Sequence, residues 1–313
     1  MRLLFAGTPD FAVPSLERFA AEHEIVAVLA QPARGSGRGR RLQDPPVAQR
    51  ARSLGLPLLQ PQRLEGALRS RLAELAPEAG VVVAYGLIFP DWLVRLPAKG
   101  FYNAHGSLLP RYRGPAPIPW AIIGGEGETG VSVQRVVRRV DAGDVLLQER
   151  VPIGEMETAG ELAGRMSTLS AELLSRALRL VEAGEARFTP QDESLATYAP
   201  KLETPMAWLD FERPSRELAR LVCGLNPWPC ARTRMAPDRL VFGAEAGPVV
   251  RILRARAVEG RPAAPGELLG IDGEALVIAC GEGALACCEM QREGKSPVSG
   301  RAFASGLAGG AAG

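Results

Sequence analysis

The sequence predicts an α/β protein in which a mainly parallel sheet covered by helices precedes a smaller β-rich domain. Two observations lead to this fold class. Short apolar runs alternate with helical patterns through the first half of the chain, whereas short β-rich runs separated by Gly, Pro and Asp occupy its last third. With 313 residues, 46% of them hydrophobic, the chain can build two domains with proper cores, and a disordered or fibrous protein is excluded.

Six strands are expected in the first domain, joined by helices of one to four turns. One of these helices, Glu65–Leu75, has leucines three and four residues apart, the spacing of a buried helical face. The loops that follow parallel strands gather along one edge of a sheet, where such folds bind ligands. The strands are expected at Arg2–Ala6, Ile25–Ala30, Leu56–Leu59, Val81–Ala84, Phe101–Ala104 and Val131–Val137.

A long helix should close this domain. Thr158 and Glu161 have the spacing of a capping box at its start, and Gly184 marks its end. Residues 187–205 then lose helical periodicity and gain prolines, which indicates a linker. The domains on either side of that linker are expected over 1–186 and 206–313.

The second domain is expected to begin with a helix, Ser215–Leu225, and to continue as a small barrel or sandwich, because its β-rich runs are short and separated by turn residues. The composition of residues 304–313 predicts a frayed tail. The strands are expected at Val249–Ala257, Gly266–Ile271, Ala275–Ala279 and Ala284–Met290.

The composition narrows the class of protein. A net charge of +2 is nearly neutral, so affinity for nucleic acid or for a membrane surface must come from local patches. Gly7 to Asp10 interrupt the apolar start, which argues against a secretory leader, and no run approaches the ~18 apolar residues of a membrane span. The 5 cysteines are odd in number and lack paired C-x-x-C spacing, which argues against disulfides or a metal site. These features predict a reduced cytoplasmic enzyme.

The first turn has the position of a phosphate loop but not its composition. In "FAGTPDFAVPSL", residues 5–16, a strand runs through one glycine into a helix. A dinucleotide fingerprint needs G-x-G-x-x-G, and no Gly-Lys-Ser/Thr occurs in the chain. The segment therefore argues against nicotinamide or ATP binding and favours a tight first turn.

A basic, glycine-rich loop is the best local candidate for an RNA contact. The stretch "RGSGRGRRLQDPPV", residues 34–47, gathers four arginines whose guanidinium groups suit phosphates. On local grounds a solvated loop without a ligand is equally compatible with this composition. The arginines are Arg34, Arg38, Arg40 and Arg41.

One of the two histidines has the setting of a functional residue. His105 ends a predicted strand, and Asn103 lies two positions earlier, so both side chains share one face. An amide beside an imidazole can supply two donors to a developing oxyanion, or a donor and a base. Asp141 or Asp144 of "RRVDAGD" could orient the imidazole, although such a segment also forms ordinary turns. The isolated Trp120, Trp208 and Trp228 are expected to be packing residues.

Several segments occur together in an order that resembles the methionyl-tRNA formyltransferase family, from residue 1 to about residue 303. The Asn-x-His-x-Ser-Leu-Leu-Pro pattern with the later Asp is shared by the wider group of enzymes that take formyl from 10-formyltetrahydrofolate. The N-terminal segment, the Gly-Arg-Gly loop and Asn-Pro-Trp-Pro are typical of the tRNA-specific members. The segments are "FAGTPDFAVPSL", "QPARGSGRGRRL", "VVVAYGLIFP", "NAHGSLLPRYRGPAPIPWAI", "ETGVSV" with "VDAGD", "TYAPKL" and "LNPWP".

This resemblance implies a Rossmann-like catalytic domain and an OB-like C-terminal barrel that helps to hold initiator Met-tRNA, in a metal-free monomer that uses 10-formyltetrahydrofolate as co-substrate. It implies a catalytic trio of Asn103, His105 and Asp141, and an acceptor-stem contact at Arg38. The other implied site residues are Ser107, Leu108, Leu109, Pro110, Tyr85 and Gly86 for folate, and Arg40 and Arg41 for tRNA.

In the implied reaction the nucleophile is the amine of an esterified methionine, whose pKa is roughly 7 to 8. Much of this amine is therefore uncharged at neutral pH, so it needs only modest assistance from a base. Asn103 and His105 are expected to donate to the oxyanion, while Asp141 sets the tautomer of His105 and helps to move the amine proton to N10. Two alternatives stay open. Arg138 and Arg139 are reminiscent of relatives that formylate amino sugars on nucleotides, and the basic loop alone would suit a non-catalytic RNA-binding protein.

Overall fold

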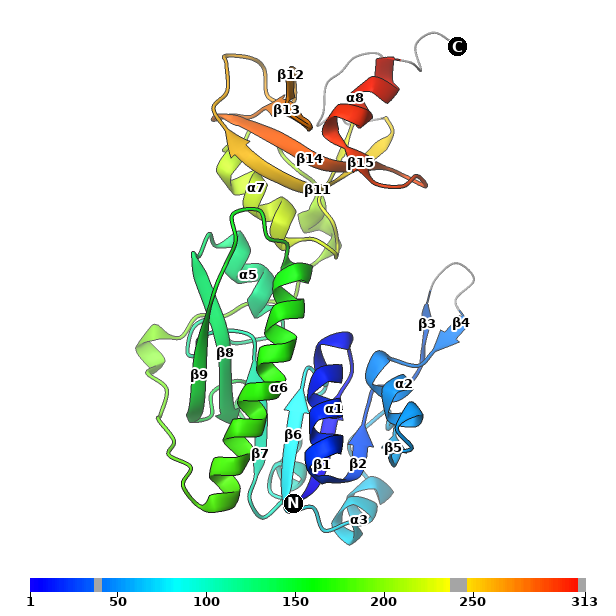
Figure 1. Cartoon of the computed structure of the whole chain (residues 1–313), viewed down its shortest axis with the longest axis vertical. Helices are drawn as coiled ribbons and strands as arrows, with labels where there is room; N and C mark the ends of the chain where they lie inside the picture. Colours follow the sequence, from blue (N-terminus) through cyan, green and yellow to red (C-terminus); the bar gives the residue numbers. More distant parts are fainter. Residues whose placement is uncertain (37–40, 237–246, 309–313) are drawn as a thin grey trace. The chain divides into compact units, whose positions relative to one another are not determined.

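The computed structural model describes residues 1–36, 41–236 and 247–308. These residues form two compact units, each made of segments that are separate in sequence (Figure 1). The first unit comprises Met1–Pro117, Thr129–Val151 and Ala163–Ala199, and the second comprises Ile118–Glu128, Pro152–Leu162 and Pro200–Gly313.

The first unit is built on a seven-stranded sheet with the order β5-β2-β1-β6-β7-β8-β9. Strands β5, β2, β1, β6 and β7 run parallel, and β8 runs antiparallel to β7. The chain moves outward from β1 to β2 and β5 and then returns to the other side of β1 at β6. The strands are β1 (Arg2–Gly7), β2 (Glu24–Leu29), β5 (Leu58–Leu59), β6 (Ala79–Val83), β7 (Phe101–His105), β8 (Glu128–Arg135) and β9 (Val145–Pro152).

The predicted mainly parallel sheet and its six strands are therefore confirmed, and β9 is an addition. This strand lies at the sheet edge and exposes the charged residues of its middle, so it lacks the apolar run by which the other strands were predicted. A second addition is a hairpin of β3 (Arg34–Ser36) and β4 (Arg41–Gln43) in the basic segment, where a loop was expected.

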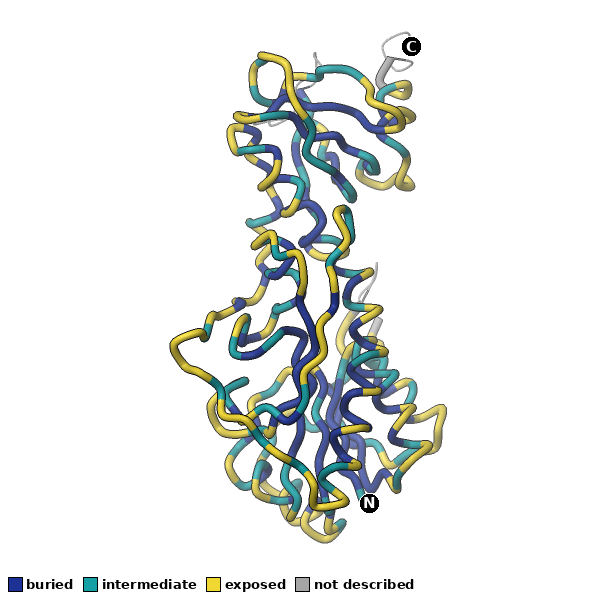
Figure 2. The backbone as a smooth tube through the Cα atoms, turned by 60° about the vertical axis from the view of Figure 1, so that its left-hand side comes forward, coloured by how far each residue is buried: buried dark blue, intermediate teal, exposed yellow. Residues whose placement is uncertain are grey.

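Helices pack on this sheet and leave strands β1, β2, β6 and β7 almost wholly buried (Figure 2). Helix α6 (Ala159–Ala183) lies beside α1 (Val13–Glu22), and Ser175 of α6 donates a hydrogen bond of 2.6 Å to Glu22 of α1 (Figure 1). Gly80 is required where β6 passes β7, because a Cβ there would collide with the Phe101 ring. The other helices before α6 are α2 (Pro46–Ser53), α3 (Ala67–Glu74), α4 (Asp91–Val94) and α5 (Pro117–Ile123).

The start of α6 confirms the predicted capping box. Thr158 Oγ1 accepts from the Glu161 backbone N–H at 3.3 Å, and the Glu161 carboxylate accepts from the Thr158 backbone N–H at 2.9 Å. Two donors that a helix start leaves unpaired are thus satisfied reciprocally. The helix ends at Ala183, directly before the predicted Gly184.

The second unit contains an antiparallel sheet with the order β10-β11-β14-β13-β12, and β15 pairs with β14. The four strands predicted in this region are confirmed. Residues 304–308 are helical rather than frayed, because α8 places Phe303 in the core, and residues 309–313 lie outside the described part. The elements are α7 (Ser215–Gly224), β10 (Arg232–Arg234), β11 (Val249–Val258), β12 (Leu268–Asp272), β13 (Ala275–Ala279), β14 (Ala284–Arg292), β15 (Val298–Ser299) and α8 (Gly300–Ala308).

None of the described helices combines the length and the apolar character that crossing a membrane requires. Within the same described ranges, no group of three or more His, Cys, Asp or Glu side chains is arranged to hold a metal ion.

Candidate active site

The end of β7 carries the amide and the imidazole that the sequence singled out. Asn103 and His105 lie two residues apart on this strand, so their side chains share a face, and β8 pairs with both. Gln134 of β8 is directly opposite Asn103, and Ser132 is opposite His105. The site is thus built on paired strands, which hold its side chains more firmly than a loop would.

Asp141 meets both residues from the loop between β8 and β9. Its Oδ2 lies 3.5 Å from Nδ1 of His105, and its Oδ1 lies 3.4 Å from Nδ2 of Asn103. Gln134 Nε2 donates to Oδ1 at 3.0 Å, and the Gly114 backbone N–H donates to Oδ2 at 2.9 Å. The carboxylate is therefore held by two firm hydrogen bonds, and the predicted trio is brought together.

Asp144, the other aspartate considered for this role, does not join the cluster. Its side chain is exposed, and its backbone carbonyl accepts from the Arg135 backbone N–H at 3.0 Å. Gly143 is required between the two aspartates, because a Cβ there would lie against the Arg135 carbonyl oxygen. The turn therefore presents Asp141, and only Asp141, to His105 among the residues described.

The ring of His105 is buried, with 6% of the residue exposed, and both of its nitrogens face oxygens. Nε2 lies 2.7 Å from the carbonyl oxygen of Tyr112. Because a carbonyl oxygen only accepts, Nε2 carries a proton and Nδ1 is directed at Asp141. The Tyr112 carbonyl thus fixes the proton on Nε2, a contact that the sequence analysis did not anticipate, while Asp141 faces the other nitrogen.

A chain of partly buried hydrogen bonds braces the Asp141 loop. Gln191 Nε2 donates to the backbone carbonyls of Asp141 at 2.9 Å and Gly143 at 2.7 Å. The Gln191 Oε1 in turn accepts from Arg113 at 2.8 and 3.1 Å. Arg113 is only 6% exposed and also pairs with Glu193 at 2.9 Å. This brace holds Asp141 in a left-handed conformation with φ of 51°, which non-glycine residues seldom adopt.

Gln134, Gln191, Arg113 and the Tyr112 carbonyl are site components that the sequence analysis missed. Gln134 could have been recognised as a candidate, because it is a polar residue within a buried strand, where it pairs in register with Asn103. No sequence pattern pointed to Gln191, since it lies in the aperiodic stretch that was predicted to be a linker. Its neighbours Thr197 and Ala199 also bind the backbone of Arg113, at 2.9 and 2.7 Å.

The residues expected to bind folate lie in two places. Ser107 is fully buried and its hydroxyl donates to the Arg111 carbonyl at 2.6 Å, which shapes the turn. Leu109 and Pro110 line a cavity of about 350 Å³ with residues 145–148 and 189–192. Leu108 packs beside Gly130, where a Cβ would collide with it.

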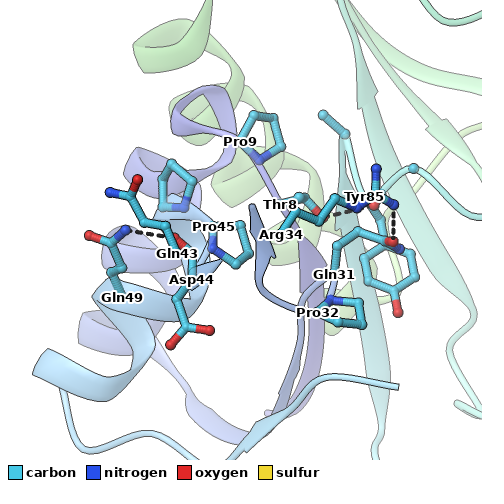
Figure 3. A pocket seen from close by; sticks show the side chains of 13 residues that line it. Thr8, Pro9, Gln31, Pro32, Arg34, Gln43, Asp44, Pro45, Gln49 and Tyr85 are labelled. Carbon is cyan, nitrogen blue, oxygen red and sulfur yellow. Dashed lines mark hydrogen bonds between the residues drawn. The ribbon is translucent and has the colours of Figure 1, made fainter. Parts of the chain in front are cut away.

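Tyr85 and Gly86 instead line a second pocket, of about 470 Å³, at the point where the strand order reverses between β1 and β6 (Figure 3). Thr8, Gln31, Arg34 and Tyr85 gather on one side of it, and Gln43, Asp44 and Gln49 on the other. Open α/β sheets bind ligands at such reversals.

Two buried polar atoms at this pocket lack a hydrogen-bond partner among the described residues. They are the amide nitrogen of Gln31, which belongs to a residue 8% exposed, and the hydroxyl of Tyr85, 2% exposed. Burial raises the pKa of Tyr85 to about 12, so the phenol is protonated at neutral pH. Both atoms are buried beneath the pocket surface, and the pocket lining itself includes Arg34, whose guanidinium suits a polar or anionic ligand.

Arg138 and Arg139, which suggested a nucleotide-linked substrate, are paired with carboxylates. Arg138 lies 3.8 Å from Asp91, and Arg139 lies 2.9 Å from Glu193. The first pair joins the loop after β8 to the start of α4, which follows the loop after β6. Three large apolar side chains on these loops are exposed: Ile88 by 74%, Val140 by 48% and Val137 by 39%.

The basic residues expected to touch tRNA are only partly described. Arg38 and Arg40 lie outside the described residues. Arg41 is in β4, where its backbone pairs with Ser36, and nothing is described of its side chain. The strands β3 and β4 are the described elements on either side of residues 37–40 in the sequence.

A mainly parallel sheet with a partly buried amide–imidazole–carboxylate cluster at the end of one strand defines a Rossmann-like enzyme suited to stabilising charge at a reacting carbonyl carbon. Residues 1–178 match the family described as "Formyl transferase", and residues 201–308 match "Formyl transferase, C-terminal domain". The chain belongs to the formyl transferase family, which confirms the resemblance inferred from its segments.

The chain is similar to curated relatives over nearly its whole length. A methionyl-tRNA formyltransferase from Nitrobacter winogradskyi is 43% identical over 314 residues, covering 98% of this chain and 96% of that protein. A protein of the same name from Xanthomonas campestris is 45% identical over 302 residues, covering 96% and 95%. Among solved structures, an N-formyltransferase from Helicobacter canadensis in complex with folinic acid and dTDP-3-aminofucose has a TM-score of 0.65 at 17% identity, covering 93% of this chain and 99% of that one. That last likeness shows the fold alone.

Proposed function

We propose that this chain transfers the formyl group of 10-formyltetrahydrofolate to the amine of methionine on initiator Met-tRNA. One observation carries the proposal: Asn103, His105 and Asp141 meet in a chain whose relatives bear the name methionyl-tRNA formyltransferase over 98% of its length. Both parts of the chain are matched in these relatives, so the proposal accounts for the second unit as well as the first.

In this reaction the amine attacks the formyl carbon, the carbonyl oxygen becomes an anion, and N10 leaves once it has received a proton. The Asn103 amide donates to that anion. Its nitrogen makes only a long contact of 3.4 Å with Asp141, so a hydrogen remains for the new oxygen. Fixed donors of this kind stabilise the tetrahedral centre because they need no reorganisation when charge develops.

His105 and Asp141 move the proton. Because Nε2 of His105 is occupied by the Tyr112 carbonyl, Nδ1 is the nitrogen that can take up or release a proton, beside the Asp141 carboxylate. A proton taken from the attacking amine is stabilised between the imidazole and the carboxylate and then passes to N10. Gln134 and the Gly114 N–H hold the carboxylate in place throughout.

The folate binds against the loops after β6 and β8. The exposed Ile88, Val137 and Val140 supply apolar surface for its aromatic rings. Tyr85 and Gly86 begin the first of these loops. Ser107, Leu108, Leu109 and Pro110 support the site from the turn after β7, where their hydrogen bonds are internal.

The tRNA is held by both parts of the chain. Arg38, Arg40 and Arg41 of the basic, glycine-rich segment contact its phosphates. The second unit adopts an OB-like arrangement, which is supported by its antiparallel strand path and by the register shifts that bend β11. In this proposal the domain over residues 1–186 performs the formyl transfer and the domain over 206–313 binds tRNA. The linker, residues 187–205, contributes Gln191 to the site of the first domain. The protein acts as a monomer in the cytoplasm, where its substrate is made.

An amino-sugar nucleotide is not the favoured substrate. Arg138 and Arg139 are already engaged by Asp91 and Glu193, so they need no phosphate to explain their presence. A non-catalytic RNA-binding protein would leave the braced trio without a use.

The test is a formylation assay with 10-formyltetrahydrofolate, in which radiolabelled initiator Met-tRNA, elongator Met-tRNA and an amino-sugar nucleotide are offered in parallel. Formylation of the initiator in preference to the other two is expected. Asp141→Asn should abolish most turnover, whereas Asp144→Asn, which removes an equal charge three residues away, should not. Formylation of the sugar nucleotide alone would refute the proposal.

A further inference from the structure

A cluster of one tryptophan and three arginines lies on one face of the sheet in the second unit. We call it the Trp208 cluster: Trp208, Arg232, Arg234 and Arg251. Trp208 is 42% exposed, although an isolated tryptophan was expected to be a packing residue. The guanidinium carbons of Arg232 and Arg234 lie 5.7 and 5.1 Å from the centroid of its ring.

The strand register sets this arrangement. Arg232 and Arg234 are two apart on β10, so both point to the same face, while Thr233 between them is buried on the other. Arg251 of β11 is directly opposite Arg232 and therefore shares its face. The Leu209 N–H donates to the Arg232 carbonyl at 2.9 Å, which anchors Trp208 beside β10.

The arginines of the cluster differ from others on the same sheet. Arg254 and Arg256, further along β11, are paired with Glu161 and Asp272. Within the described ranges, Arg232, Arg234 and Arg251 form no ion pair with a carboxylate. Arg232 and Arg234 bond only to the carbonyls of Pro229 and Gly247, at 2.9 and 3.0 Å, and Arg251 bonds to Gln291 at 3.3 Å. No carboxylate in the described part of the chain therefore neutralises their charge, which suits binding of an external anion.

We propose that the Trp208 cluster binds the phosphate backbone of the RNA substrate. This inference rests on the proposed function, which brings tRNA to the chain, and adds a contact remote in sequence from the β3–β4 hairpin. Guanidinium groups match phosphate oxygens in geometry, and three of them on one face can span neighbouring phosphates.

The indole of Trp208 distinguishes the Trp208 cluster from a group of solvated arginines, because it restricts the positions of their guanidinium groups. Two arginines stacked on one ring keep fewer conformations than free arginines, so less entropy is lost when a phosphate is bound. Trp208 therefore acts by orienting the guanidinium groups. Its removal should weaken RNA binding although it leaves the charge of the protein unchanged.

The test measures binding of fluorescently labelled tRNA to the full chain by anisotropy at several salt concentrations. Each phosphate contact contributes about −0.9 to the slope of log K against log salt. Arg232→Gln and Arg234→Gln should each reduce the steepness of the slope by about that amount, so that the affinity lost between about 50 and 200 mM salt shrinks by about 3.5-fold per arginine. Trp208→Ala should weaken binding, and Trp208→Phe, which keeps a ring, should restore most of it.

Arg256→Gln is the matched control, since it removes the same charge from the same sheet at a residue already paired with Asp272. The inference is overturned if Arg232→Gln and Arg234→Gln give the slope and affinity of Arg256→Gln. A formylation assay on the same preparations separates this failure from that of the proposed function. If the wild-type protein formylates Met-tRNA and the cluster variants bind tRNA as Arg256→Gln does, the proposed role of the Trp208 cluster is disproved and the proposed function is not. If the protein binds tRNA through the Trp208 cluster but does not formylate it, the proposed function is disproved and the role of the cluster is not.

Discussion

The side-chain amide of Gln191 donates a hydrogen bond of 2.9 Å to the backbone carbonyl of Asp141, 50 residues earlier in the chain. The same nitrogen holds the carbonyl of Gly143. A residue in a stretch without regular structure therefore determines where the carboxylate of the candidate active site lies. Four predictions follow from this site and from the fold that carries it.

Asn103→Ala should lower kcat by about 10²–10³, because it removes the donor proposed for the oxyanion. The residue is only partly buried and makes one long hydrogen bond, so the fold should be unaffected. Single-turnover formylation measures the effect, and thermal unfolding of the same sample provides the control for folding. Turnover close to that of the wild type would contradict the role given to Asn103.

Gln191→Ala should lower kcat by about 10-fold or more while the KM for folate stays nearly constant. Without its amide, Asp141 loses the bond that supports its left-handed backbone, and small displacements of a catalytic group are costly. The buried Gly143 carbonyl also loses its donor, so the free energy of unfolding should fall by about 1–3 kcal/mol. Steady-state kinetics and urea unfolding measure the two effects.

Asp192→Ala is the control for this prediction. Asp192 follows Gln191 but caps a short 3-10 turn (Glu193–Leu195) by accepting from the Ser194 N–H. It should leave kcat within about twofold of the wild type, because no bond of the Asp141 brace involves it. If both variants lost activity equally, the effect would belong to the segment as a whole and not to the Gln191 amide.

Gly143→Ala should destabilise the protein by about 1–3 kcal/mol and reduce turnover, because its Cβ would press on the Arg135 carbonyl and displace the Asp141 loop. Gly164→Ala, in an open position on α6, should instead be neutral or stabilise by about 0.5–1 kcal/mol. Differential scanning calorimetry compares the two. Equal unfolding midpoints would show that the Asp141 loop can move without cost.

Acid should weaken the capping box at the start of α6. The hydrogen bond from Arg254, followed by that from the Thr158 backbone, lowers the pKa of Glu161 from 4.5 to about 2. Since the folded pKa is below the unfolded one, this stabilisation is complete above pH 4.5 and is lost as the pH falls toward 2. The side chain is 49% exposed, so the contribution should be about 1 kcal/mol.

The measurement is the difference in unfolding free energy between the wild type and Glu161→Gln. It should be near 1 kcal/mol at neutral pH and should shrink as the pH is lowered through the window set by the two pKa values. A difference that stays constant down to pH 2 would show that the charge of Glu161 does not stabilise the helix start.

Much of the fold could be predicted because its signals are local. Apolar runs and helical spacing reflect the geometry of a few consecutive residues, so the parallel strands and the capping box at Thr158 were predictable. The edge strand β9 was not predicted, because the residues in its middle are charged and exposed and form no apolar run. The helical state of residues 304–308 was not predicted, because their Gly/Ala composition is typical of a tail, although the buried Phe303 anchors the helix to which they belong.

That Asn103 and His105 share a face follows from the strand pattern in the sequence, since strand geometry requires this of residues two apart. The packing of the folded chain is what makes Asp141, and not Asp144, complete the cluster, and what places the Tyr112 carbonyl against His105 and Gln191 against the loop. The same packing places Trp208 beside two arginines at the surface. These relationships join residues far apart in the chain, and their geometry depends on how strands and loops pack, which no local pattern encodes.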